Sequence, residues 1–321
     1  MKQAIQNFAK QFSYNPVVEN VSQVKPFKHF VVLGMGGSHL AADLLKLGDP
    51  LLPLTVHHDY GLPPLPDAAL QRSLIIASSY SGNTEETLDG FTRARDKGYS
   101  VAALSIGGKL LELAKSMGVP FVQMPDTNIQ PRCALGFNMR GLLKLLGKED
   151  TLAQTGALAA NLNPFVYEET GKALAARIKG RTPVIYASGR NRALAYTWKI
   201  KFNETGKIPA FYNTFPELNH NEMTGFDINE SSTFFADRFY GILLKDPNDD
   251  QRILRRMEIL EKLYRDRGIA LEAFELAGED IWHKLFSSLL IADWAALYNA
   301  EQYGLEPEQV PMIEEFKKLI A

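Results

Sequence analysis

The sequence predicts an α/β protein with two doubly wound parallel sheets, and three observations lead to this expectation. Short apolar segments of strand length alternate with longer segments of helical periodicity. The apolar segments are continuous, which is typical of parallel strands buried on both faces. The pattern starts again near the middle of the chain. We therefore expect two flavodoxin-like, three-layer units.

The first half contains four candidate strands. They are Phe30–Leu33, Leu74–Ala77, Val101–Leu104 and Val119–Val122. A glycine-rich turn follows the first strand. A loop rich in Ser and Thr follows the second and leads into a helix that starts near Glu85. Strands connected by helices in this way build successive βαβ units of a parallel sheet.

A polar, alanine-rich segment over residues 149–163 separates the halves. We place the boundary near residue 150, which gives domains over residues 1–150 and 151–321. In the second domain we expect strands at Val184–Ala187, Ile208–Tyr212 and Thr233–Ala236, and helices at Asn191–Asn203, Asp249–Arg267 and Ile281–Tyr303. The last helix is mostly apolar, so we expect its apolar face in the core or at a subunit interface.

Composition narrows the range of partners. The 321 residues are 45% hydrophobic and 22% charged, with a net charge of −2. A chain this close to neutral gives no reason to expect nucleic acid or an acidic membrane as a partner. No segment has the ~20 apolar residues of a membrane-spanning helix, and the N-terminus lacks the pattern of a signal peptide. The single cysteine, Cys133, excludes an intrachain disulfide and fits a small buried residue in a cytoplasmic protein.

The turn Gly34–Ser38 (GMGGS) joins the first strand to a helix. Glycines let the backbone approach a ligand closely, and the N-terminus of the following helix favours an anion. A dinucleotide fingerprint would need a glycine where His39 stands, and no Lys-Ser/Thr pair completes a Walker loop. We therefore expect Gly36, Gly37 and Ser38 to contact a phosphate. A turn without any ligand is the alternative.

The loop after the second strand is more specific. Residues Ser78–Thr87 (SSYSGNTEET) crowd five Ser and Thr hydroxyls into one strand-to-helix turn. Hydroxyls and backbone N–H groups at a helix start can surround the oxygens of a phosphate. A capping role for Thr84 is compatible with this. The candidate phosphate-binding residues of this loop are Ser79, Tyr80, Ser81 and Thr84.

With these loops the chain resembles the SIS (sugar isomerase) family. Further stretches occur in the order seen in its bifunctional phosphoglucose/phosphomannose isomerases, so the resemblance spans residues 25–318. The matching stretches are Gly34–Ser38, Asp59-Tyr60 before Leu62-Pro63, Ser79–Thr87, Gln130–Arg132, Gly189–Arg192, Asn203-Glu204 and His220–Glu222.

The resemblance implies a phosphate site made by Ser38, Ser79, Ser81 and Thr84. It also implies a homodimer with active sites at the subunit interface. The implied reaction interconverts glucose 6-phosphate and fructose 6-phosphate, and often mannose 6-phosphate, through a cis-enediolate. Such chemistry needs a base, a group that opens the sugar ring, and positive charge over the enediolate oxygens. It needs no metal and no redox cofactor.

Four residues match the positions that carry these roles in the family. Glu204 resembles the catalytic glutamate, and a carboxylate of this kind can serve as a base. His220 resembles the histidine that assists ring opening, and the resemblance implies that it comes from the neighbouring subunit. Histidine side chains are well suited to passing protons near neutral pH. Arg132 resembles the arginine that stabilises the enediolate. Lys317 resembles the active-site lysine of the C-terminal helix. The alternatives are a solvated glutamate, a histidine held by Glu217 or Glu222, and surface cations.

One position departs from the family pattern. Family members that accept mannose 6-phosphate tend to carry a threonine seven residues before the lysine. This chain has Val310 there. The threonine hydroxyl would help a C2 epimer rotate about its C2–C3 bond, so Val310 places the mannose activity in doubt.

Two other function classes stay open on sequence alone. One is another SIS enzyme, such as an amino-sugar phosphate isomerase or an etherase. The other is a non-catalytic sugar-phosphate sensor, although residues 1–25 are too short for the helix-turn-helix that such sensors carry. The presence of both Glu204 and His220 favours catalysis.

Overall fold

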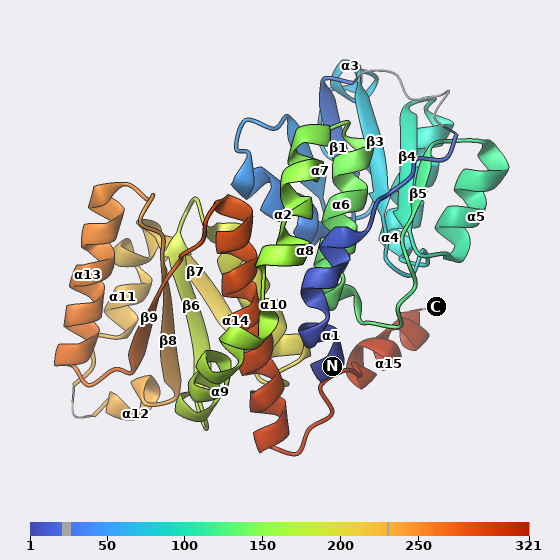
Figure 1. Ribbon diagram of the computed structural model, residues 1–321. Coiled ribbons are helices and arrows are strands. Elements are labelled where there is room, and N and C mark those ends of the chain that lie inside the picture. The colour runs from blue at the N-terminus through green and yellow to red at the C-terminus, as the bar shows by residue number, and fades with distance from the viewer. Residues whose placement is uncertain (21–26, 230, 321) are drawn as a thin grey trace. The chain divides into compact units, whose positions relative to one another are not determined.

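The computed structural model describes residues 1–20, 27–229 and 231–320. Its backbone contacts divide the chain into two compact units. The N-terminal unit is Gln6–Leu162, and the C-terminal unit is Asn163–Ala321 together with Met1–Ile5. Each unit contains one parallel sheet (Figure 1), which confirms the predicted fold class.

The sheet of the N-terminal unit has the strand order β2-β1-β3-β4-β5 among the described residues. Its strands are β1 (His29–Leu33), β2 (Leu54–His57), β3 (Ser73–Ser78), β4 (Ser100–Ser105) and β5 (Phe121–Gln123). The register pairs Val31 with Thr55 on one side and with Ile75 on the other. This is the flavodoxin-like order, in which the chain direction across the sheet reverses between β1 and β3.

Helices cover both faces of this sheet. On one face lie α4 (Glu85–Asp96) and α5 (Gly108–Met117), and on the other lie α2 (Gly37–Gly48) and α6 (Leu135–Leu145). Successive strand residues point to opposite faces, so Val31 and Ile75 pack with α4 and α5, whereas Leu104 faces Gly141 of α6. Short helices complete the unit: η1 (Phe8–Ser13), α3 (Asp67–Leu70), η3 (Pro131–Cys133), α7 (Glu149–Gly156) and α8 (Leu158–Asn161).

The sheet of the C-terminal unit has the order β7-β6-β8-β9 among the described residues. Its strands are β6 (Thr182–Ser188), β7 (Phe211–Phe215), β8 (Phe239–Lys245) and β9 (Leu271–Glu275). All three strand pairs are parallel. The order repeats the first four positions of the other sheet, which is the repetition that the sequence predicted.

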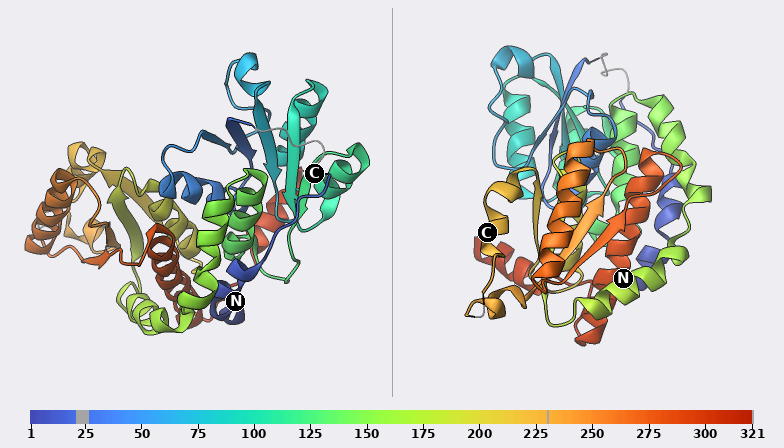
Figure 2. Two further views of the ribbon diagram at one scale, coloured as in Figure 1. Left: turned by 45° about the horizontal axis from the view of Figure 1, so that its top comes forward. Right: turned by 90° about the vertical axis from the view of Figure 1, so that its left-hand side faces the viewer.

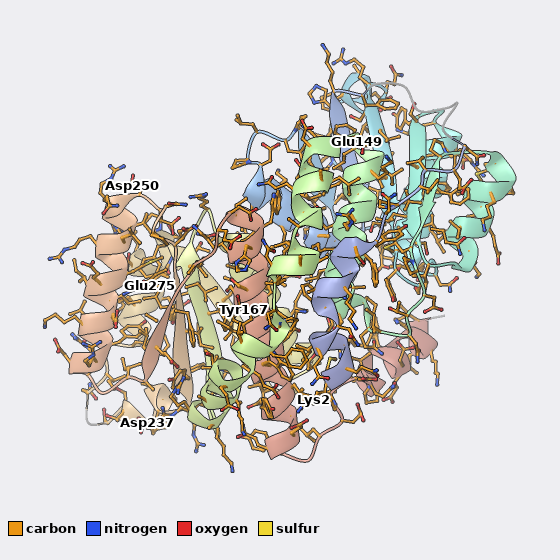
Figure 3. The ribbon with its side chains drawn as sticks, in the orientation of Figure 1. Lys2, Glu149, Tyr167, Asp237, Asp250 and Glu275 are labelled. Carbon is orange, nitrogen blue, oxygen red and sulfur yellow. The ribbon has the colours of Figure 1, made fainter. Side chains whose placement is uncertain are left out.

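Helices α9 (Glu168–Arg177), α10 (Arg192–Glu204) and α14 (Ile281–Gln302) pack together against this sheet. Helix α13 (Gln251–Asp266) packs on the other face with α11 (Glu222–Gly225) and α12 (Thr233–Ala236), and Figure 2 shows this layering from two further directions. Asp250 starts α13 (Figure 3) by accepting a hydrogen bond from the Arg252 N–H at 2.8 Å. The remaining helices are α1 (Lys2–Gln6), η4 (Pro164–Tyr167), η5 (Glu217–His220) and α15 (Pro311–Ile320).

In the described ranges, no helix combines the length and the apolar character that crossing a membrane requires.

Thr233–Ala236 is a helical turn, so the predicted strand at this position is wrong. The Thr233 hydroxyl and N–H both donate to the Asn229 carbonyl, at 2.9 and 3.0 Å, and the Ser231 N–H donates to the Asn229 side chain. Such local bonds favour a turn over an extended chain. The strand lies just beyond, as β8. The strand predicted at Ile208–Tyr212 begins only at Phe211, because Asn203 binds the Ile208 carbonyl and holds the preceding residues as a loop.

The division between units falls after Leu162, later than the boundary expected near residue 150. Helices α7 and α8 pack on α6 and η1, and they bury Leu152 and Leu158. The Arg140 guanidinium of α6 donates to the Leu152 carbonyl at 2.8 Å. These contacts attach the polar segment to the N-terminal unit, although its composition resembles that of a linker.

Candidate active site

The two predicted phosphate loops meet at the carboxyl edge of the N-terminal sheet. They follow β1 and β3, which are neighbours in the sheet. The Tyr80 N–H donates to the Ser38 hydroxyl at 2.9 Å, and the Ser78 hydroxyl donates to the Ser38 carbonyl at 2.9 Å. The chain direction reverses between these strands, and in doubly wound sheets this is where ligands bind.

Hydroxyls gather beside the start of α4. Ser79 Oγ and Thr84 Oγ1 lie 2.8 Å apart, and the Gly82 N–H donates to Ser79 Oγ at 3.1 Å. Thr84 stands at the N-cap position, but its hydroxyl contacts Ser79 and does not cap the helix. The first N–H groups of a helix have no partner within it. Together with the exposed Ser81, this arrangement suits an anion with several oxygens.

Gly82 is required by the fold of this loop. Its φ is +72°, and a Cβ there would collide with the carbonyl of Gly107. Gly36 also has a positive φ, of +51°, in the neighbouring loop, and it is exposed. The glycines therefore let two loops turn sharply and leave backbone accessible at the edge of the sheet.

Gly37 brings Arg132 to the same edge. A Cβ on Gly37 would lie 2.7 Å from the backbone nitrogen of Arg132, so only glycine lets η3 pack this closely on the start of α2. The Arg132 side chain is 1% exposed and has contacts of its own within the protein. The N-terminal unit thus brings together both loops and the predicted arginine. The Tyr80 ring is buried, so Tyr80 reaches this site through its backbone.

Glu204 is the last residue of α10, in the C-terminal unit, and is half-buried. One turn earlier, the fully buried Lys201 forms an ion pair with Asp293 of α14, with Nζ–Oδ distances of 2.8 and 3.0 Å. A buried pair of this kind holds the end of α10 against α14. The position of Glu204 therefore depends on the core of the unit.

Lys207 connects the end of α10 to the C-terminal segment. Its ammonium donates to the Glu204 carbonyl at 2.7 Å and also to the Gln309 carbonyl. Its φ is +59°, which is uncommon for a residue other than glycine. The chain before α15 therefore passes beside Glu204, and Val310 follows directly in this segment.

His220 ends η5 and is exposed. The two carboxylates considered as its alternative partners are engaged elsewhere. Glu217 accepts a hydrogen bond from the Asn221 amide at 2.8 Å, and Glu222 accepts hydrogen bonds from Tyr186 and Asn213. Neither carboxylate has a bond to the imidazole in the part of the chain that the structure describes.

Lys317 lies on α15, and its ammonium is 2.7 Å from Glu314. Every residue of α15 from Pro311 to Ile320 is exposed. The C-terminal unit therefore builds no enclosed site around this lysine by itself. Of the four predicted catalytic residues, Glu204, His220 and Lys317 belong to this unit, and Arg132 belongs to the other.

Comparison with known proteins adds an independent line of evidence. Residues 167–320 match the family described as bacterial phospho-glucose isomerase C-terminal SIS domain. The chain is 32% identical to the bifunctional phosphoglucose/phosphomannose isomerase of Aquifex aeolicus, over 98% of its own length and 96% of that protein. It is 33% identical to the enzyme of the same name from Caldicellulosiruptor bescii, over 97% and 93%. The chain belongs to the family of the bifunctional phosphoglucose/phosphomannose isomerases.

The fold extends to more distant proteins. Glucosamine-6-phosphate deaminase from Thermotoga maritima superposes with a TM-score of 0.66 at 14% identity, over 97% of each chain. At this identity the likeness shows a shared fold and nothing more. The family membership rests on the sequence relatives.

The carboxyl edge of the C-terminal sheet differs in charge from that of the N-terminal sheet. The loop after β8 occupies the place in its sheet that the predicted phosphate loop takes after β3, but it carries the buried Asp246 and Asp249. Burial by itself would raise the pKa of Asp246, but the Lys284 ammonium at 2.7 Å and the Asn248 N–H together hold this pKa below its ordinary value. Burial raises the pKa of Asp249, which accepts a hydrogen bond from Ser188 at 2.8 Å. Buried carboxylates disfavour an anion here.

Several residues around the candidate site carry no signal in the sequence that indicates their contacts. Lys207 lies in no recognisable motif. Its contacts with the Glu204 and Gln309 carbonyls depend on its positive φ and on a segment 102 residues later in the chain. Tyr186 reads as an ordinary strand residue, although it binds Glu222. The stretch His220–Glu222 was part of the resemblance, and the carboxylate at its end was the available signal.

Proposed function

We propose that the protein interconverts glucose 6-phosphate and fructose 6-phosphate by proton transfer through a cis-enediolate. The observation that carries this proposal is the pair of loops joined by Ser38 and Tyr80 at the switch point of the N-terminal sheet. They offer several hydroxyls and a helix N-terminus to a phosphate. Relatives with the same full-length pattern are named bifunctional phosphoglucose/phosphomannose isomerases.

The chemistry is divided among four side chains. Glu204 removes the C2 proton of the open-chain aldose and returns it to C1. His220 passes a proton to the ring oxygen and opens the sugar ring. Arg132 and Lys317 place positive charge near the enediolate oxygens. The phosphate end of the substrate is held by Gly36, Gly37, Ser38, Ser79, Tyr80, Ser81 and Thr84.

The exposure of Lys317 and His220 within their own unit supports a homodimer in which a second subunit completes the site. In this proposal His220 comes from the neighbouring subunit. The lone buried thiol of Cys133 is consistent with a reducing cytoplasm.

The test is a coupled assay of the purified protein on fructose 6-phosphate without added metal. Glucose 6-phosphate and mannose 6-phosphate are read separately. We expect glucose 6-phosphate to form. Binding of fructose 6-phosphate without any product would favour a sensor, and turnover of an amino-sugar phosphate alone would indicate another SIS enzyme.

The hydroxyl pair of the phosphate loop should control substrate affinity. Replacing Ser79 and Thr84 together with alanine is expected to raise KM for fructose 6-phosphate about 10- to 100-fold, because hydrogen bonds to a charged group contribute about 1.5–3 kcal/mol. The fall in kcat should be smaller. Ser116→Ala is the control, since that hydroxyl donates to a carbonyl within α5. An unchanged KM in the double variant would move the phosphate site elsewhere.

Val310 is expected to limit the mannose reaction. Val310→Thr should raise the rate with mannose 6-phosphate about tenfold relative to that with glucose 6-phosphate, since a single well-placed polar contact changes discrimination by about this much or more. The ratio of the two rates is measured in one preparation. Val310→Ala is the matched control, because it changes the size of the side chain without adding a hydroxyl. An equal gain in both variants would contradict the role of the hydroxyl.

A further inference from the structure

The Glu222 carboxylate joins the segment that contains His220, made of η5 and α11, to the sheet of the C-terminal unit. Glu222 accepts a hydrogen bond from the Tyr186 hydroxyl at 2.7 Å and another from the Asn213 amide at 2.6 Å. Tyr186 on β6 and Asn213 on β7 are directly paired in the parallel register. The carboxylate therefore spans two adjacent strands, and its backbone is two residues from His220.

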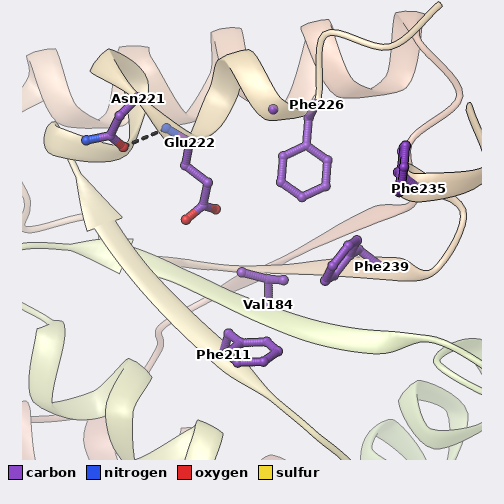
Figure 4. Close-up of a pocket in the computed structure, with 9 residues that line it drawn as sticks. Val184, Phe211, Asn221, Glu222, Phe226, Phe235 and Phe239 are labelled. Carbon is purple, nitrogen blue, oxygen red and sulfur yellow. Dashed lines mark hydrogen bonds between the residues drawn. The ribbon is translucent and has the colours of Figure 1, made fainter. Parts of the chain in front are cut away.

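Apolar packing holds this segment through partly buried side chains, since Met223, Phe226 and Ile228 contact the core of the unit. Helix α11, which starts at Glu222, has no buried residue. A cavity of about 440 Å³ lies beside it, and Figure 4 shows Glu222 and Phe226 at its wall. Leu218 and Ala236 are the buried residues on either side of the segment. Among the described residues between Leu218 and Ala236, Glu222 makes the polar contacts with the sheet that are nearest in sequence to His220.

Further bonds carry this attachment back toward the imidazole. The Asn221 side chain accepts a hydrogen bond from the Glu222 N–H at 2.6 Å and donates to Glu217 at 2.8 Å. His220 therefore lies inside a short hydrogen-bonded turn whose far end is Glu222. Freeing Glu222 would release one end of this turn.

The Tyr186 hydroxyl, which donates to Glu222, is buried. Tyr186 is 1% exposed, and burial, together with the nearby Tyr264 and the Glu222 charge, raises its pKa well above the ordinary value. Its hydroxyl therefore keeps its proton over the working pH range. Hydrogen bonds that an ionised acceptor receives are the strong class.

We propose that Glu222 is a positioning residue that holds His220 in place through Tyr186 and Asn213. This inference rests on the proposed role of His220 in opening the sugar ring. A displacement of about 1 Å of a group that transfers protons can lower the rate about 100-fold. The substrate phosphate is bound by the other unit, so its affinity should not depend on Glu222.

The test compares Glu222→Ala, His220→Ala and the double variant. Glu222→Ala is expected to lower kcat about 10- to 100-fold, as displacement of a reacting group by ~1 Å does, with KM changed less than about threefold. The double variant should have the same kcat as His220→Ala, because residues that act through one another are not additive. Glu222→Gln keeps one oxygen acceptor for the two donors and should recover only part of the activity, and Tyr186→Phe, which removes one of the two donors, should also fall between Glu222→Ala and the wild type.

Asp227→Asn is the control within the same segment, since Asp227 forms an exposed ion pair with Arg267. It should keep the wild-type kcat. Melting curves of every variant, followed by tryptophan fluorescence, show that the C-terminal unit is folded. A kcat that falls by the product of the two single effects would overturn the proposal, and so would a wild-type kcat in Glu222→Ala.

A second readout does not depend on turnover. In protein labelled at its six histidines, Glu222→Ala should shift or broaden the His220 ring signals in NMR spectra and leave the other five sets in place. Unchanged His220 signals would overturn the positioning role. A wild-type protein without isomerase activity would instead defeat the proposed function, and the NMR result would still decide whether Glu222 holds His220.

Discussion

Replacing Glu204 with glutamine is expected to lower kcat about 10³-fold, since a positioned general base contributes typically 10²- to 10⁴-fold. The amide has nearly the same shape but does not accept the C2 proton. Binding of fructose 6-phosphate should change less than about threefold, because the proposed phosphate site consists of hydroxyls and backbone groups of the other unit. Calorimetric titration measures the binding, and the coupled assay measures kcat.

Glu258→Gln is the matched control for this experiment. Glu258 is an exposed helix glutamate that forms an ion pair with Arg255 at 3.0 Å. Its replacement should leave both kcat and affinity at wild-type values. If Glu204→Gln kept more than a tenth of the activity, the base would have to be another group.

The second large effect concerns stability. Lys201→Met is expected to lower the free energy of unfolding of the C-terminal unit by about 3–5 kcal/mol, because it leaves the Asp293 carboxylate buried without its cation. Denaturant unfolding at neutral pH, followed by tryptophan fluorescence, measures this. Trp198, Trp282 and Trp294, which are all the tryptophans of the chain, lie in this unit, so the signal reports on it alone.

Two further variants separate the buried charge from the loss of packing. Lys201→Met combined with Asp293→Leu should recover most of the lost stability, since replacing both partners of a buried pair is often neutral or stabilising. Lys144→Met removes a surface pair with Glu149 and should cost less than about 1 kcal/mol. A double variant as unstable as Lys201→Met would show that the cost lies in packing and not in the orphaned carboxylate.

The layered architecture could be predicted where buried strands read as continuous apolar runs. β1, β3, β4 and β6 lie within a residue or two of their expected positions because both faces of each are covered. β8 was missed because Gly241 interrupts its apolar run. A Cβ at Gly241 would lie 2.9 Å from the end of the Leu271 side chain, which would have to move to make room for it.

The false strand at Thr233–Ala236 has the opposite cause. Its apolar residues include Phe234 and Phe235, each 60% exposed, so they do not mark a buried strand. Hydrophobic pattern alone does not distinguish an exposed aromatic pair from a core segment. Bonds to Asn229 decided the local structure, and a pattern of apolar residues does not report them.

The candidate phosphate loops were visible in the sequence because Gly, Ser and Thr gather at two strand-to-helix turns, and their role in binding phosphate stays a prediction. The structure brings Ser38 and Tyr80 into contact, which sequence spacing alone does not show. The catalytic candidates came from the family resemblance. Lys207 and the Glu222 attachment depend on contacts between segments distant in sequence, so no local pattern could indicate them.

Solvent isotope incorporation tests the central claim most directly. Fructose 6-phosphate is incubated in D₂O with the wild-type protein, and the product is examined by proton NMR. We expect glucose 6-phosphate that carries solvent deuterium at C2, because in the proposed mechanism the proton that Glu204 takes from C1 exchanges with solvent before it is delivered to C2. Product with no deuterium at C2, or no product at all, would contradict isomerisation by proton transfer.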